Sequence, residues 1–287
     1  MIPCQYKLQN QHKIGSTQKL NLNINLKIIF EQILIIVTII IFFLPVQFTV
    51  FGDETDSDVP KWLSDKYEIS NPISLIPQKN LEGWTAHNGK EPDKNNWSVE
   101  NGKLTCNGTK NNHLNGDLVT KKEYENFILD FEWINSKSGN SGIKYKLKDF
   151  GEIGGIINHN DKFCWLGCEY QILDDANHAE GTKNKYKNSA AALYSILAPD
   201  KNKKLNPHNK TNTGKIIVAN EHVEHWLNGE KVLEYNINTP EWKAAFAKCK
   251  YAKAENFAQN KKGLIMLQDH GNKIIFTKLT IREIKKK

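Results

Sequence analysis

Alternating apolar and polar residues mark a series of short strands from about residue 81 to the end of the chain. The clearest stretch is residues 127–134, because side chains on a strand point alternately to its two faces. One face carries Phe127, Leu129, Phe131 and Trp133, and the other carries Asp130 and Glu132. We therefore expect this strand to cover a core with its apolar face.

The same pattern predicts strands at residues 141–147, 168–173, 215–219, 222–227, 231–235, 263–269 and 274–284. Two Asn-Gly pairs, Asn101-Gly102 and Asn228-Gly229, predict tight hairpins, because both residues of such turns take a positive φ. A single helix is expected from Pro240, with Thr239 as its N-cap. Many short strands with one short helix predict an all-β antiparallel sandwich or jelly roll.

The first fifty residues have a different character. Residues 33–46 are nearly unbroken apolar sequence, preceded by a stretch with lysines and followed by acidic residues 53–58. This order is typical of a secretory signal, whereas residues 28–50 are also long enough for an uncleaved membrane anchor. We divide the chain into a signal or anchor (1–52), a lead-in (53–74) and one domain (75–287). The domain is expected to be exported: periplasmic, secreted, or anchored on the outer side of a membrane.

Charge argues against nucleic acid as a partner. The formal net charge is +7, and both signs are mixed along residues 53–287. The one dense basic run is Lys285-Lys286-Lys287 at the C-terminus, whereas nucleic-acid binders usually cluster their charge on one face. Membrane contact is expected only through the N-terminal segment.

The cysteines assign neither a disulfide nor a metal site. Cys106, Cys164, Cys168 and Cys249 remain once the N-terminal segment is set aside, an even number that permits disulfides without pairing them. A zinc site would usually need a second close pair of ligands, which Cys106 and Cys249 do not form.

Candidate chemistry centres on the strand that contains Glu169 and Gln171, which alternation places on one face. Carboxylates and amides bind sugar hydroxyls, and an aromatic ring such as Trp226 can stack on a sugar. Further candidates lie at strand ends: Asn140 and Ser141 in one turn, and Gln268, Asp269 and His270 in another. A histidine beside a carboxylate can act as a general base. The alternative is an ordinary exposed sheet face.

The spacing of the acids argues against a familiar hydrolytic mechanism. Glu169 and Asp174 are five residues apart and would point to opposite faces of a regular strand. A two-carboxylate glycosidase needs both acids at one site. No serine-nucleophile elbow, phosphate loop or dinucleotide-binding motif is present.

Several strings, taken together and in order, resemble the 3-keto-disaccharide hydrolase family, which includes 3-keto-glucoside lyase and hydratase domains. The resemblance runs from about residue 75 to residue 284. Residues 148–163 depart from the family pattern. The strings are Leu81-Glu-Gly-Trp-Thr, Trp97-Ser-Val-Glu-Asn-Gly, Tyr124-Glu-Asn-Phe-Ile-Leu-Asp-Phe-Glu-Trp, Gly139-Asn-Ser-Gly-Ile, Glu169-Tyr-Gln-Ile-Leu-Asp-Asp, Ala192-Leu-Tyr, His222-Val-Glu-His-Trp-Leu-Asn-Gly, Pro240-Glu-Trp-Lys and Gly263-Leu-Ile-Met-Leu-Gln-Asp-His-Gly.

The resemblance implies a concanavalin A-like jelly-roll sandwich of two antiparallel sheets and an enzyme that breaks down 3-keto-glycosides. Its chemistry is removal of the C2 proton, β-elimination at C1 and hydration of the 3-keto-glycal. Such a path needs a base, enolate stabilisation and an acid for the leaving group. It also implies an oxidoreductase that supplies the keto sugar.

We assign roles to the candidate residues on this basis. Glu169 or His270 is the expected base and Glu132 the partner acid. Substrate-binding roles go to Gln171, Asn140, Ser141, Trp226, Gln268 and Asp269. No cofactor is required by this path, although a divalent cation could stabilise the enolate, with Asp174, Asp175 and His178 as candidate ligands. The alternatives are a non-catalytic, lectin-like sugar-binding module and an ordinary glycoside hydrolase.

Overall fold

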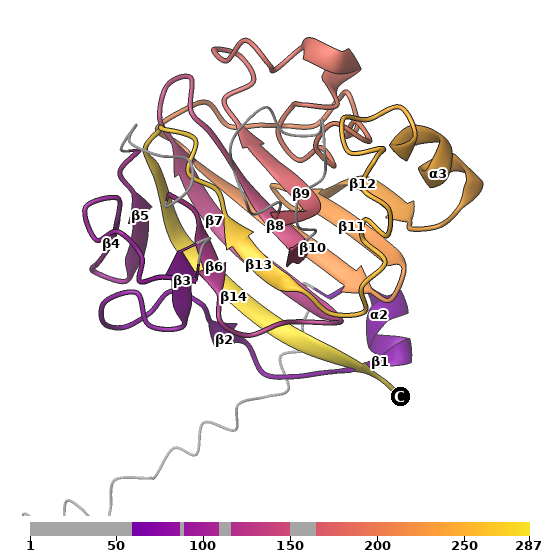
Figure 1. The fold of residues 1–287 in the computed structure, drawn as a ribbon, viewed down its shortest axis with the longest axis horizontal. Coiled ribbons are helices and arrows are strands. Elements are labelled where there is room, and N and C mark those ends of the chain that lie inside the picture. Colours follow the sequence, from indigo (N-terminus) through magenta and orange to yellow (C-terminus); the bar gives the residue numbers. More distant parts are fainter. Residues whose placement is uncertain (1–58, 87–88, 109–115, 150–164) are drawn as a thin grey trace, which may run out of the picture. The chain divides into compact units, whose positions relative to one another are not determined.

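Two antiparallel sheets pack face to face in this computed structural model (Figure 1). The structure describes residues 59–86, 89–108, 116–149 and 165–287, and Pro60–Lys287 forms one compact unit. The expected N-terminal signal or anchor, Cys164, and residues 150–163 of the segment that departs from the family pattern lie outside the described residues. The predicted all-β jelly-roll sandwich is confirmed.

The larger sheet has nine strands and is called the large sheet. Its continuous path runs β12-β11-β10-β7-β14-β5-β4, with β1 and β2 pairing additionally along β14. The strands are β1 (Tyr67–Ile69), β2 (Ile73–Ser74), β4 (Trp97–Glu100), β5 (Lys103–Cys106), β7 (Phe127–Asn135), β10 (Thr211–Ala219), β11 (His222–Leu227), β12 (Glu230–Asn236) and β14 (Ile274–Lys286).

The smaller sheet, called the small sheet, has five strands in the order β3-β6-β13-β8-β9. They are β3 (Trp84–Ala86), β6 (Leu118–Thr120), β8 (Asn140–Asp149), β9 (Trp165–Leu173) and β13 (Leu264–Leu267). Strands predicted from alternation therefore recur in both sheets. Both Asn-Gly pairs form the expected turns, since Asn101, Gly102, Asn228 and Gly229 all have a positive φ.

The core lies between the sheets, where the alternating apolar faces meet. On β7, Phe131 and Trp133 are almost fully buried, and the Tyr170 ring of β9 packs against both with ring centroids 5.0 and 6.2 Å away. Because the sheets contact through these faces, the opposite face of β9, with Glu169 and Gln171, is the outer face of the small sheet.

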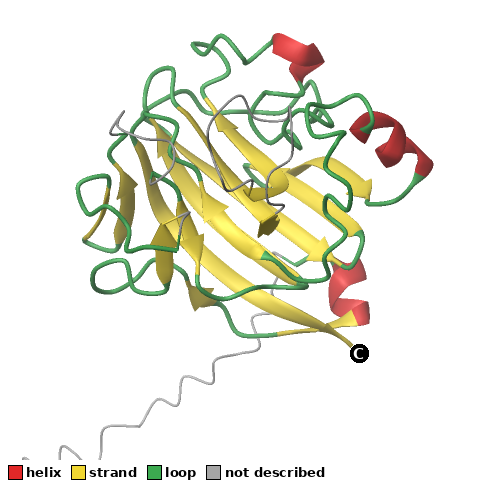
Figure 2. Cartoon of the chain, viewed as in Figure 1, coloured by secondary structure: helices red, strands yellow, loops and turns green. Residues whose placement is uncertain are grey.

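Helices lie at the margin of the strands (Figure 2). The predicted helix is α3 (Pro240–Phe246), and its cap is confirmed, since the Thr239 hydroxyl accepts a bond from the Trp242 amide. The expectation of one helix was too low, because α2 (Lys61–Lys66) and the 3₁₀ turn η1 (Lys183–Tyr186) also form. Residues 60–74, expected as a lead-in, supply α2, β1 and β2. Across the described residues, no helix has the length and apolarity needed to cross a membrane.

Candidate active site

Strands β8 and β9 carry the candidate site on the outer face of the small sheet. They pair antiparallel, with Lys144 opposite Glu169, Gly142 opposite Gln171, and Asn140 opposite Leu173. Residues that lie directly opposite in antiparallel strands share a face. The register therefore gathers a carboxylate, an ammonium and two amides on neighbouring positions.

Glu169 is a buried acid, only 3% exposed. Its side chain lies over Gly142, since a Cβ added to that glycine would stand 2.5 Å from Glu169 Oε1. Burial raises the pKa of Glu169, whereas Lys144, Lys250 and His270 act in the opposite direction. A carboxylate with a raised pKa, surrounded by cations that still favour ionisation, has the properties of a general base.

Gln171 offers an acceptor on the same face. Its Nε2 donates to Asn140 Oδ1 over 2.9 Å. Its Oε1 is buried and has no hydrogen-bond partner among the described residues. A buried oxygen without a partner carries a cost that a donor from a bound molecule would remove. Gln171 Oε1 is therefore available to accept a bond from a donor group of a bound molecule.

The segment after β9 folds back along the edge of that strand and brings Tyr194 to the site. Ala191 N donates to Gln171 O (2.8 Å), and Tyr194 N donates to Glu169 O (3.0 Å). The Tyr194 hydroxyl donates to Glu180 Oε2 over 3.2 Å. Burial, followed by the charges of Glu169 and Glu180, raises the pKa of Tyr194. Tyr194 is thus a neutral hydrogen-bonding group beside Glu169.

Lys250 reaches the site from the segment that follows α3. Its Nζ lies 4.4 Å from the centre of the Tyr194 ring. A stack of aromatic rings supports this segment, with Trp242 on Phe246 (5.0 Å) and Tyr251 on Phe257 (5.5 Å). Although the residue is exposed as a whole, partial desolvation and then Lys144 lower the pKa of Lys250, and Glu169 opposes this.

His270 and Gln268 lie at the end of β13, near Glu169. His270 is exposed and close enough to affect the pKa of Glu169. Gln268 N donates to Gly142 O over 2.9 Å, which fixes this end of β13 against β8. The structure therefore brings together five of the predicted residues: Glu169, Gln171, Asn140, Gln268 and His270.

Ser141 and Asp269, predicted to bind substrate, have structural bonds instead. Ser141 lies opposite Ile172 on the core face of β8, and its hydroxyl donates to Gln268 O. The Asp269 carboxylate accepts bonds from Asn96 Nδ2 and from the Gly271 amide, both over 2.8 Å. These bonds hold the β13–β14 connection in place.

Glu132 and Trp226 lie on the other sheet, on the face turned away from the core. Glu132 accepts a bond from the Thr277 hydroxyl, and Trp226 Nε1 donates to Glu224 Oε2 over 2.7 Å. The whole core separates this face from Glu169, so Glu132 cannot act as its partner acid. Trp226 likewise cannot stack on a sugar bound at Glu169.

The residues considered for a divalent cation are occupied by other bonds. The Asp174 carboxylate accepts bonds from the Ser138 amide and from Asn177 Nδ2. Asp175 accepts a bond from the Ala190 amide and lies 2.9 Å from Lys203 Nζ. His178 Nδ1 accepts a bond from the Glu180 amide. These side chains fix the segment after β9 and do not form a shared ligand set.

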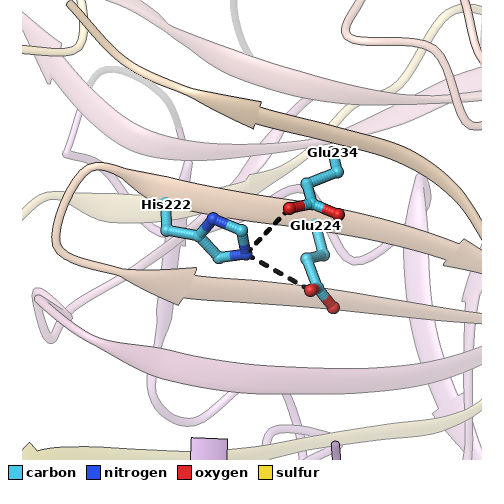
Figure 3. Close-up of side chains that lie close together, drawn as sticks. All are labelled: His222, Glu224 and Glu234. Atoms are coloured by element: carbon cyan, nitrogen blue, oxygen red, sulfur yellow. Dashed lines mark hydrogen bonds and ion pairs between the residues drawn. The ribbon is translucent and has the colours of Figure 1, made fainter. Parts of the chain in front are cut away.

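Within the described ranges, one trio of potential metal ligands, His222, Glu224 and Glu234, has one potential ligand atom per residue within 4.8 Å of the others (Figure 3). It lies on β11 and β12 in the large sheet. Glu224 already accepts bonds from Trp62, Trp226, His222 and Lys231. Burial acts to raise the pKa of Glu224, but these bonds outweigh it and lower that pKa. The bond to Glu224 in turn raises the pKa of His222. The trio is thus part of a polar network that joins α2 to the large sheet.

Comparison with known proteins identifies the family of this chain. The profile of the 3-keto-alpha-glucoside-1,2-lyase-like domain matches residues 71–282. The chain belongs to this family. Membership of this family makes the chain an enzyme that acts on glycosides.

A curated relative and two solved structures extend the comparison. A 3-keto-disaccharide hydrolase of Bacteroides thetaiotaomicron is 30% identical over 226 residues, which cover 73% of this chain and 77% of the relative. A putative glycosyl hydrolase of Parabacteroides distasonis has a TM-score of 0.61 at 26% identity, covering 79% of this chain and 98% of that one. A second from the same organism has a TM-score of 0.55 at 24% identity, covering 74% and 99%, and supports the fold alone.

Four residues of the site were missed in the sequence: Lys144, Lys250, Tyr194 and Glu180. Lys144 could have been found, because it alternates with Gly142 on a predicted strand. Tyr194 lies in one of the strings that carry the family resemblance, without a signal for its role. Glu180 and Lys250 come from irregular segments, where alternation gives no information.

Proposed function

We propose that this chain cleaves 3-keto-glycosides, disaccharides among them, by elimination followed by hydration, with Glu169 as the base. One observation carries the proposal: Glu169 is buried among cations and has no paired acid on its strand, since Asp174 is bonded to the Ser138 turn. This arrangement suits removal of one proton better than double displacement by two carboxylates.

The first step is loss of the C2 proton. A carbonyl at C3 acidifies that proton, and the Glu169 carboxylate takes it, leaving an enolate whose charge rests on the C3 oxygen. Lys144 and Lys250 provide positive charge beside Glu169, where the enolate forms. Cations fixed in advance near a developing oxyanion stabilise the transition state.

The second step breaks the C1–O bond. The enolate electrons form the C1=C2 double bond, and the departing oxygen takes a proton. Lys250 is the proposed acid, because its lowered pKa makes its ammonium a better proton donor. Water then adds across C1=C2: its hydroxyl joins C1, its proton restores the Lys250 ammonium, and the Glu169 carboxyl, after exchanging its proton with solvent, protonates C2. The sum is hydrolysis of the glycosidic bond.

Binding of the sugar falls to the amides. Gln171 Oε1 accepts a bond from a sugar hydroxyl, and the Asn140 amide lies beside it, bonded to Gln171 Nε2. Amides and hydroxyls fix sugar hydroxyls by directed hydrogen bonds.

The test offers the purified protein a nitrophenyl glucoside and its 3-keto derivative. Release of nitrophenol from the keto sugar alone, with deuterium from D2O entering C2 of the product, is expected. Glu169→Gln is expected to abolish both release and exchange while preserving sugar binding. Release from the unoxidised glucoside at a similar rate would refute elimination. Binding without any release would indicate a lectin-like module.

Two further proposals concern the setting. The apolar run at residues 33–46 supports action outside the cytoplasm, and fractionation of cells that produce the full chain would test this. Recovery in the cytosol would contradict it.

Because the substrate must first be oxidised at C3, an oxidoreductase acting on sugar hydroxyls has to supply it. Cell extracts lacking such an activity should cleave only keto sugars added from outside.

A further inference from the structure

A pocket of about 360 Å³ opens at one end of the sandwich. It lies where β7 begins, β10 turns into β11, and β12 ends, and residues 258–261 complete its wall. It shares no lining residue with the candidate active site. Its volume is at the lower end of the range for small-molecule sites, about 300–1,000 Å³.

Lys146 provides a buried cation in this pocket. It sits at the irregularity of β8 between Tyr145 and Lys148, with a φ of 49°, and is only 6% exposed. Its Nζ donates to Asn260 O over 2.8 Å. Among the described residues, no carboxylate lies within ion-pair distance of this ammonium, which therefore has donors to spare. Burial lowers the pKa of Lys146, as expected for a charge without a close partner.

Asn260 provides an acceptor without a donor. Its Nδ2 donates to Lys262 O over 2.7 Å, which orients the amide. Its Oδ1 is buried and receives no hydrogen bond from any described residue. The pocket thus holds an unused donor on Lys146 and an unused acceptor on Asn260.

The remaining wall combines the apolar side chains of Ile237 and Ala258 with polar groups that are held in place by their own bonds. Gln259 Nε2 donates to Asn238 Oδ1 (2.9 Å), and Asn238 Nδ2 donates to Glu221 Oε1 (3.1 Å). The lining contains two acids, Glu125 and Glu221, and two lysines, so its formal charge is zero. Fixed polar groups bind with a smaller loss of conformational entropy than mobile ones.

We infer that this pocket is a second binding site, separate from Glu169, for a neutral polyhydroxylated molecule such as a sugar ring. A hydroxyl both accepts and donates, so neighbouring hydroxyls can accept from Lys146 and donate to Asn260 Oδ1. A bare anion would satisfy Lys146 only, would leave Asn260 Oδ1 unpaired, and would meet Glu125 and Glu221. An apolar molecule would leave both groups unpaired.

The test is a titration of the full, ¹⁵N-labelled chain with glucose, followed through side-chain amide resonances. Saturable shifts of the Asn260 and Gln259 amides are expected, and sodium sulfate should not reproduce them. Lys146→Met should weaken binding by about tenfold or more, since a charged hydrogen bond is lost. Asn260→Ala, at a half-buried position, gives a second measure should Lys146→Met fold poorly.

Gln171→Ala, at the candidate active site, is the matched control and should leave these shifts unchanged. No shift of the Asn260 amide with glucose, or an equal shift with sulfate, would overturn the inference. So would unchanged binding in both pocket variants. The readout does not depend on turnover, so its failure is distinguishable from failure of the proposed reaction.

Discussion

Gly142→Ala tests whether the position of Glu169 controls the reaction. The new Cβ would lie 2.5 Å from Glu169 Oε1 and 3.0 Å from its Cγ and Cδ. An ordinary contact begins at 3.4 Å, so the carboxylate must retreat by about 0.9 Å. A displacement near 1 Å at a reacting group costs about 100-fold in rate. We expect kcat/KM for a nitrophenyl 3-keto-glucoside to fall by that factor.

The chain contains a matched control in Gly116→Ala. There the new Cβ would lie 2.5 Å from Asp269 Oδ2, another buried carboxylate, but outside the candidate site. Both variants should lose about 1–3 kcal/mol of stability through overpacking, measured by denaturant unfolding. Only Gly142→Ala should lose activity beyond its effect on folding. Activity of Gly142→Ala equal to that of Gly116→Ala would refute the role of Glu169.

Three predictions concern pH. Burial raises the pKa of Glu169 in the folded state above its ordinary value of 4.5, so the ionised carboxylate destabilises the fold as the pH rises above 4.5. Glu169→Gln should therefore raise the melting temperature at pH 8 but not at pH 4. Lys250→Met should slow the reaction, because it removes the proposed acid. It also removes a charge that lowers the pKa of Glu169, so the acidic limb of the remaining kcat/KM against pH should move upward; an unmoved or lowered limb would contradict this. Burial lowers the pKa of His225 from 6.5 to about 4, so the imidazole is protonated more readily in the unfolded chain. The free energy of unfolding, measured by denaturant titration, should therefore fall by about 3 kcal/mol between pH 6.5 and 4. His225→Gln should lack this pH dependence.

Much of the fold could be predicted from local sequence patterns. Alternation located the strands within a few residues, as in β11 (His222–Leu227), because a strand with one face on the core repeats every second residue. The Asn-Gly turns and the Thr239 cap followed equally from local backbone chemistry. Helix α2 was missed, since a six-residue helix has too few turns to establish a helical period.

The candidate site was only partly predictable. Glu169, Gln171 and Asn140 share one face of adjacent strands, which alternation can indicate. Assigning Glu132 and Trp226 to the same site failed, because alternation gives the face of a strand but not which sheet the strand joins. The role of Lys250 could not be predicted, because its position depends on a contact with the ring of Tyr194, which is distant in sequence, and on ring stacking within an irregular segment.

The pairing of β1 with the end of β14 has a practical consequence. Tyr67 pairs with Lys286, so the first strand of the folded unit lies beside its C-terminus (Figure 1). Domains whose ends are adjacent usually tolerate circular permutation and insertion into other proteins. Both ends belong to the large sheet, whereas Glu169 belongs to the small one. A short linker between the present ends, with new termini opened at the Asn101-Gly102 hairpin, would therefore leave β8 and β9 uncut.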